Sequence, residues 1–120
     1  MEEGLLERSE IMLAFVTTTI LGLFISLLGI INMTGNIYSL HWYHRQRVTE
    51  ENRKPFGKFV GSGTLIIGVA VIIFGALLLL FESTQNEIYV FVGTAELIVG
   101  IIAGLIISFY AMIKYNKGIF

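Results

Sequence analysis

Cysteine and aspartate are both missing from this chain of 120 residues. Without cysteine there is no disulfide, no thiolate metal site and no cysteine nucleophile. Without aspartate there is no Ser-His-Asp triad and no aspartate–magnesium site of the kinase or P-loop type. Charge is also scarce, because 14% of the residues are charged whereas 55% are hydrophobic. A chain this short and this apolar is typical of one membrane-embedded unit.

Three apolar segments are long enough to cross a membrane. A membrane helix needs about 20 residues, because each residue advances it by only about 1.5 Å. The segments cover residues 11–33, 59–81 and 88–113, and only the third contains an ionisable residue, Glu96. We therefore predict an all-α integral membrane protein, a bundle of three transmembrane helices that forms a single domain over residues 1–120 with a loop at residues 34–58.

Local signals mark the ends of these helices. The first segment follows glutamates instead of the basic residues of a signal peptide, so we expect it to be retained. Pro55 suits the first turn of the second helix. Thr84 and Glu87 have the spacing of a capping box, which predicts a tight hairpin before the third helix.

Basic residues are distributed unevenly between the two sides. Lys114 and Lys117 lie in the tail and five more lie in the loop, whereas Arg8 is the only one on the opposite side. Because Lys and Arg are retained in the cytoplasm, we predict a plasma-membrane protein with its N-terminus outside and its loop and C-terminus inside. The five loop residues are expected to contact lipid headgroups, and no basic domain remains for nucleic acid: Arg45, Arg47, Arg53, Lys54 and Lys58.

Small residues line one face of each predicted helix. Such faces let helix backbones approach closely in lipid, where the hydrophobic effect does not drive association. The seven-residue spacing of several glycines is typical of a left-handed supercoil. We expect close packing in the bundle, together with self-association or membership of a larger membrane complex. The glycines are Gly22, Gly29, Gly61, Gly68, Gly75, Gly93, Gly100 and Gly104.

Glu96 is the most informative residue for function. A carboxylate in the bilayer costs at least about 2.5 kcal/mol unless it is paired, solvated or protonated. Glu96 shares a helical face with Gly93 and Gly100, so we expect it to point into the bundle or across an oligomer interface. Its depth matches that of Thr18 and Thr19, whose hydroxyls are its predicted partners. Desolvation without a countercharge favours the neutral acid.

Two functions are compatible with this glutamate. It could be a proton or cation site of a small proton-coupled carrier, with Thr18 and Thr19 beside it. It could instead be a hydrogen-bonded structural group in a non-enzymatic interaction protein, which is the preferred interpretation. The chain resembles small multidrug-resistance transporters in its size and in having a single membrane glutamate. Those transporters, however, have four spans with the glutamate in the first.

Other chemistry has weaker support. His41 and His44 could bind a metal if Glu50 and Glu51 folded back toward them, but two histidines three residues apart are a weak signal. The glycines of residues 57–63 lack the Gly-Lys-Ser/Thr ending of a phosphate loop. We therefore predict no enzyme activity, no cofactor and no metal.

The central loop carries a family resemblance. Residues 40–52, LHWYHRQRVTEEN, followed by Pro55-Phe56-Gly57-Lys58, resemble a family of small uncharacterised three-span membrane proteins of Gram-positive bacteria. The resemblance covers well under a third of the chain. It implies a bacterial plasma membrane and three spans, and it implies no particular activity, substrate or site residue.

Overall fold

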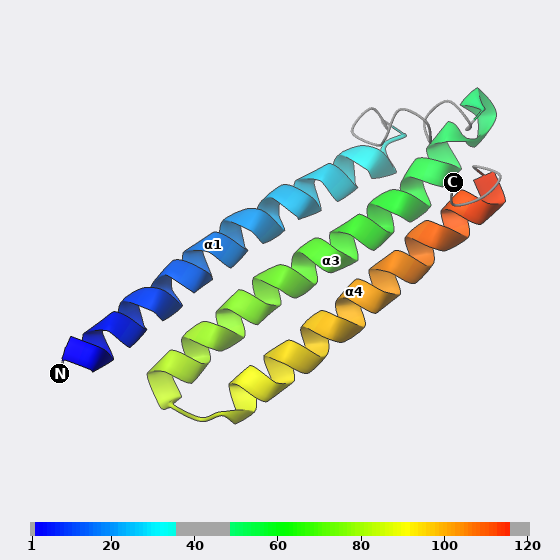
Figure 1. Cartoon of the computed structure of the whole chain (residues 1–120). Helices are drawn as coiled ribbons and strands as arrows, with labels where there is room; N and C mark the ends of the chain where they lie inside the picture. The colour runs from blue at the N-terminus through cyan, green and yellow to red at the C-terminus, as the bar shows by residue number, and fades with distance from the viewer. Residues whose placement is uncertain (1, 36–48, 116–120) are drawn as a thin grey trace.

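The computed structural model describes residues 2–35 and 49–115, and these form three long helices without any strand (Figure 1). They are α1 (Glu2–Met33), α3 (Glu50–Thr84) and α4 (Ile88–Tyr115). All three are long and apolar enough to cross a membrane. The prediction of an all-α, three-helix, multi-pass membrane protein is confirmed.

The second membrane helix is longer than its apolar segment. α3 begins at Glu50, so the last residues of the predicted loop 34–58 are helical. Pro55 was predicted in the first turn of this helix, but it consequently lies in the second turn. The reason is that hydropathy detects only the part of a helix inside the hydrocarbon, whereas polar turns can extend the same helix beyond it.

The hairpin between α3 and α4 uses a different cap from the predicted one. Thr84 is the last residue of α3, and its Oγ1 donates to the carbonyl of Leu80 at 2.8 Å. Asn86 Oδ1 accepts the backbone N–H of Ile88 at 3.1 Å, which satisfies a free donor at the start of α4. The capping box predicted at Thr84 and Glu87 is therefore wrong. Gln85 ends α3 in the left-handed conformation, with φ of 57°.

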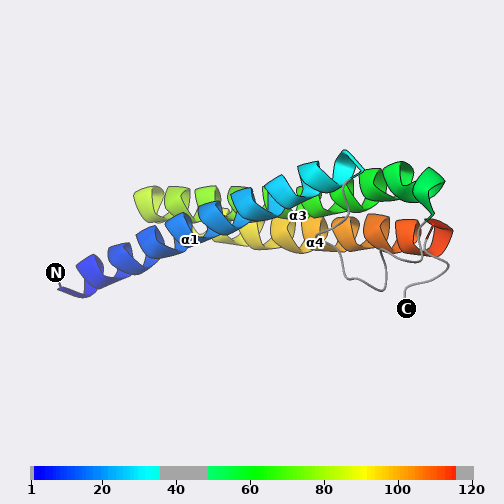
Figure 2. The same ribbon diagram turned by 90° about the horizontal axis from the view of Figure 1, so that it is seen from above.

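α3 lies between α1 and α4, and the two outer helices scarcely touch each other (Figure 1). Seen from above, α1 runs obliquely across the other two helices (Figure 2). Gly61 and Gly68 of α3 face α1, whereas Gly63 and Ala70 face α4. At about 100° per residue these two sets lie on nearly opposite sides of α3. The bundle is therefore an open layer with the central helix in contact on both flanks.

One broad face of this layer is more open than the other. On α3, Ile66, Val69 and Ile73 are exposed on one face. Thr64 and Val71 are half-buried on the other. The outer helices therefore lean toward the second face and leave the first uncovered.

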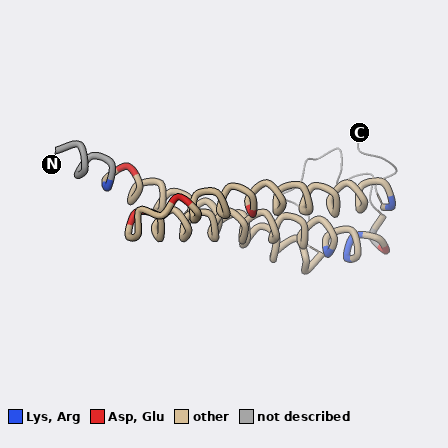
Figure 3. Tube along the Cα trace, turned by 90° about the horizontal axis from the view of Figure 1, so that it is seen from below, with Lys and Arg blue, Asp and Glu red and all other residues tan. Residues whose placement is uncertain are grey.

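Apart from Glu96, the charged residues of the described chain lie toward the two ends of the layer (Figure 3). At the hairpin end, Arg8 Nε of α1 lies 3.0 Å from Glu82 Oε1 of α3. At the opposite end Phe56, Val60 and Ala111 form a small buried cluster between α3 and α4. This arrangement puts long apolar stretches, with Glu96 as their one ionisable residue, between two polar ends, because charged side chains are costly inside a membrane.

Candidate functional site

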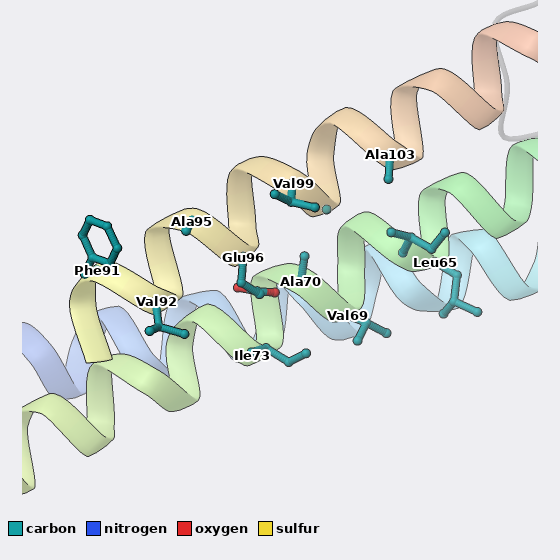
Figure 4. A pocket seen from close by; sticks show the side chains of 12 residues that line it. Leu65, Val69, Ala70, Ile73, Phe91, Val92, Ala95, Glu96, Val99 and Ala103 are labelled. Atoms are coloured by element: carbon teal, nitrogen blue, oxygen red, sulfur yellow. The ribbon is translucent and has the colours of Figure 1, made fainter. Parts of the chain in front are cut away.

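An open groove of about 790 Å³ lies between α3 and α4 on the uncovered face. Of the described residues that line this groove, only Glu96 has a polar side chain, and we refer to the groove as the Glu96 groove (Figure 4). The lining residues are Leu65, Ile66, Val69, Ala70 and Ile73 of α3, and Phe91, Val92, Ala95, Glu96, Val99, Gly100 and Ala103 of α4.

The spacing between α3 and α4 changes along their length. Near Gly104 the backbones touch, since a methyl group there would lie 2.5 Å from the carbonyl oxygen of Gly63. Near Gly93 the helices meet through side chains instead, because a methyl group at Gly93 would lie 3.3 Å from the Phe74 ring and 3.4 Å from Leu77 Cβ. The groove lies where close backbone contact gives way to side-chain contact.

The Glu96 carboxyl is held in this groove without a partner. Its Oε2 is enclosed and has no hydrogen-bond partner among the described residues. Figure 4 shows the carboxyl directed from α4 toward α3, close to Ala70 and Ile73. A polar group that is removed from water and left unpaired is costly. A hydrogen-bonding or cationic partner would therefore stabilise the Glu96 carboxyl group.

The predicted threonine partners belong to another interface. Thr18 Oγ1 donates within α1, to the carbonyls of Ala14 at 2.8 Å and Phe15 at 3.1 Å. Its side chain also contacts the position of Gly75 on α3. Thr19 Oγ1 is enclosed and has no hydrogen-bond partner in the described part of the chain. The structure thus brings neither threonine to Glu96, because α3 stands between their helices.

The glycines contact one another inside a single chain. Gly22 meets the backbone of Gly68, and Gly29 meets that of Gly61. Gly75 faces Thr18. Gly93, Gly100 and Gly104 of α4 contact the other flank of α3. The small-residue faces are therefore occupied by intramolecular packing.

One further residue was missed by the sequence reasoning. Asn32 is a buried polar side chain in the first span, at 2% exposure. Its polarity in an apolar segment could have marked it as an interface residue. Ser26, on the small-residue face of the same span, is also buried, at 8% exposure. Gly63 contacts Gly104, and its position two residues after Gly61, on the far side of the helix, marks a second packing face of α3.

The basic end of the layer is only partly described. Lys54 and Lys58 are exposed, and Arg53 is half-buried with an enclosed Nε that has no hydrogen-bond partner in the described residues. Lys114 Nζ lies 3.4 Å from the hydroxyl of Tyr110. Arg45, Arg47, His41 and His44 lie outside the described residues. Within the described ranges, no three histidine or acidic side chains are grouped as metal ligands.

Comparisons with protein-family models, with curated proteins and with solved structures find no match for this chain. The fold and the groove define a multi-pass membrane protein with three spans and one embedded carboxyl group. Its function has to be inferred from that geometry.

Proposed function

We propose that this protein is a non-enzymatic membrane protein that works by association, as a homo-oligomer or an accessory subunit of a larger membrane complex. The observation that carries the proposal is the enclosed, unpaired Oε2 of Glu96 in an otherwise apolar groove. A membrane carboxyl group with no partner among the described residues of its own chain is expected to face one from outside. The proposed contact surface is the Glu96 groove.

The internal packing supports the choice of this surface. The glycines of α1 and α3 already contact each other, so they are not free to contact another molecule. The uncovered face of α3 and α4 retains both a groove and an unsatisfied polar group. An enzymatic role has little support because acid–base or nucleophilic catalysis needs at least two positioned groups, and the groove offers one.

Shielding of the groove tests the association. The chain has no cysteine, so single cysteines can be placed without background. Val99 lies in the groove and is 65% exposed, and its neighbour Ile98 lies outside the groove with 52% exposed. In native membranes we expect Val99→Cys to react more slowly than Ile98→Cys with a membrane-soluble maleimide. Equal rates for the two variants would contradict a covered groove.

A second candidate function is a small proton-coupled carrier that uses Glu96. The volume of the groove favours it, since about 790 Å³ falls within the usual range for small-molecule sites. A cation bound beside Glu96 would favour the ionised carboxyl and release its proton. Thr18 and Thr19 would take no direct part, because they lie on the far side of α3.

Proton release separates the carrier from the association role. Candidate cations added to purified protein between about pH 5 and about pH 9 should release protons from the wild type and none from Glu96→Gln, because a carboxyl at position 96 can give up a proton to a bound cation and an amide cannot. Absence of release from the wild type over a broad panel of cations, with a Gln variant of equal stability, would remove the carrier.

We also propose a bacterial plasma membrane, with the N-terminus outside and the basic end inside. Lys54, Lys58 and Lys114 at that end support headgroup contact, because cytoplasmic leaflets are anionic. Cysteines at Glu3, Gln46 and Gln85 test the orientation. An impermeant thiol reagent on intact cells should label positions 3 and 85 and leave 46 unlabelled. The reverse pattern would invert the topology.

A further inference from the structure

We propose that a second copy of this chain occupies the Glu96 groove, with the Glu96 carboxyl groups of the two copies hydrogen-bonded to each other across a two-fold interface. This inference rests on the proposed association role and names its partner. It follows from three properties of the groove, which are its depth, its chemistry and its shape.

Depth favours a second copy over an unrelated partner. Glu96 lies about 12 Å along the axis of α4 from its first residue, Ile88. All copies of a membrane protein insert with one orientation, because their flanking charges are the same. A two-fold axis along the membrane normal therefore places the two Glu96 side chains at the same depth. An unrelated partner would need a polar group that happens to lie at that depth.

The chemistry of the carboxyl group is self-complementary. No lysine, arginine or histidine occurs within residues 11–33, 59–81 or 88–113, so a second copy supplies no countercharge at this depth. A protonated carboxyl has one O–H donor and retains acceptor oxygens. Two such groups, or one with a carboxylate, can therefore satisfy each other. The amide of glutamine has the same capacity to donate and accept.

The shape of the groove permits close approach at Glu96. The neighbours on the same face of α4 include the small residues Ala95 and Ala103. Val92 and Val99, one turn to either side, are exposed at 46% and 65%. The glutamate side chain has three rotatable bonds, so its carboxyl can turn from the wall of the groove toward a facing helix.

Cross-linking in native membranes tests the second copy. Homodimers linked by a disulfide through Val99→Cys should form efficiently on mild oxidation, because the side chains of the two copies lie close together beside the proposed axis. Ile98→Cys lies at nearly the same depth but on another face of α4, so it should form few linked homodimers. No Val99-linked homodimer, or equal yields from the two positions, overturns the second copy.

Substitution of Glu96 tests the carboxyl pair. In the Val99→Cys background, Glu96→Gln should preserve cross-linking, whereas Glu96→Leu should weaken dimerisation by about three-fold to about thirty-fold, the range for loss of one hydrogen bond between membrane helices. Circular dichroism should show the same helix content for both variants. Unchanged dimerisation in a folded Leu variant, or its loss in the Gln variant, overturns the pairing.

The shielding and cross-linking results together separate this inference from the proposed function. If Val99→Cys is shielded from maleimide but yields no homodimer, association stands and the second copy falls. If Val99→Cys is neither shielded nor cross-linked, both fall. If it is shielded only after a lipophilic cation is added, the groove is a ligand site, and this inference is overturned.

Discussion

The two flanks of α3 are built differently. Toward α1, glycine backbones meet at successive levels, with Gly61 against Gly29 and Gly68 against Gly22. Toward α4, backbone contact occurs at Gly63 and Gly104 but is replaced at Gly93 by contact with larger side chains. The first interface is close at both of these levels, whereas the second opens along its length.

This difference shows where a membrane helix bundle can hold a polar group. In lipid, helices associate by close packing of small residues, and an interface that is packed throughout has no room for a long carboxyl side chain. Glu96 lies on the flank that opens, next to the level where Gly100 meets Ala70. The α1–α3 contact thus stabilises the fold, and the α3–α4 contact provides the candidate site.

The largest expected effect is at the close interface. In Gly61→Ala the new methyl would meet the carbonyl oxygen of Gly29 and lie 2.7 Å from the backbone nitrogen of Met33, so α1 must shift. We expect a destabilisation of about 1–3 kcal/mol. Reversible unfolding in mixed micelles measures it.

The matched control for that variant lies on the other flank. Gly93→Ala adds the same methyl at 3.3 Å from Phe74 and 3.4 Å from Leu77, which need shift only slightly. The gain of helix propensity, about 1 kcal/mol, should offset that contact. A Gly93→Ala variant as unstable as Gly61→Ala would refute the contrast between the two interfaces.

An intermediate effect is expected beside the groove. In Gly100→Ala the new methyl would lie 2.6 Å from Ala70 Cβ. Ala70→Gly removes that atom, so it should rescue Gly100→Ala, with a coupling of about 0.5–3 kcal/mol in a double-mutant cycle of unfolding free energies. Additive effects would mean that these two residues do not meet and that the register of α3 on α4 is different.

The smallest effect is expected at the hairpin end. Arg8 Nε lies 3.0 Å from Glu82 Oε1, but the arginine side chain is 72% exposed. Such pairs contribute about 0–1 kcal/mol, and salt screens them. Arg8→Ala and Glu82→Ala should therefore show a coupling below about 1 kcal/mol that shrinks in high salt. A larger coupling, or one insensitive to salt, would show that α1 is held by this pair as well as by its glycines.

The sequence predicted the helices better than their arrangement. Three long apolar segments lead directly to three spans, and this prediction is confirmed. The start of α3 at Glu50 was missed because its first turns are polar. The cap at Asn86 was missed because Thr84 and Glu87 fit a capping box by spacing alone.

The candidate site could be predicted only in part. Glu96 was recognisable as a lone carboxyl in an apolar span. Its surroundings were not, because equal depth along two helices does not determine whether the helices touch. Thr18 shares the depth of Glu96, yet its helix packs on the opposite flank of α3. The residues that form the groove, such as Val69 and Val92, are ordinary apolar residues with no signal of their own.

The central claim is that Glu96 meets the Glu96 of a second copy of this chain. Single-molecule photobleaching of labelled protein in lipid bilayers, over a range of protein-to-lipid ratios, tests it most directly. We predict a reversible monomer–dimer equilibrium for the wild type and Glu96→Gln, and a shift toward monomer for Glu96→Leu of about three-fold to about thirty-fold in the dissociation constant. A wild type that stays monomeric at every ratio, or three proteins with the same dissociation constant, would contradict the claim.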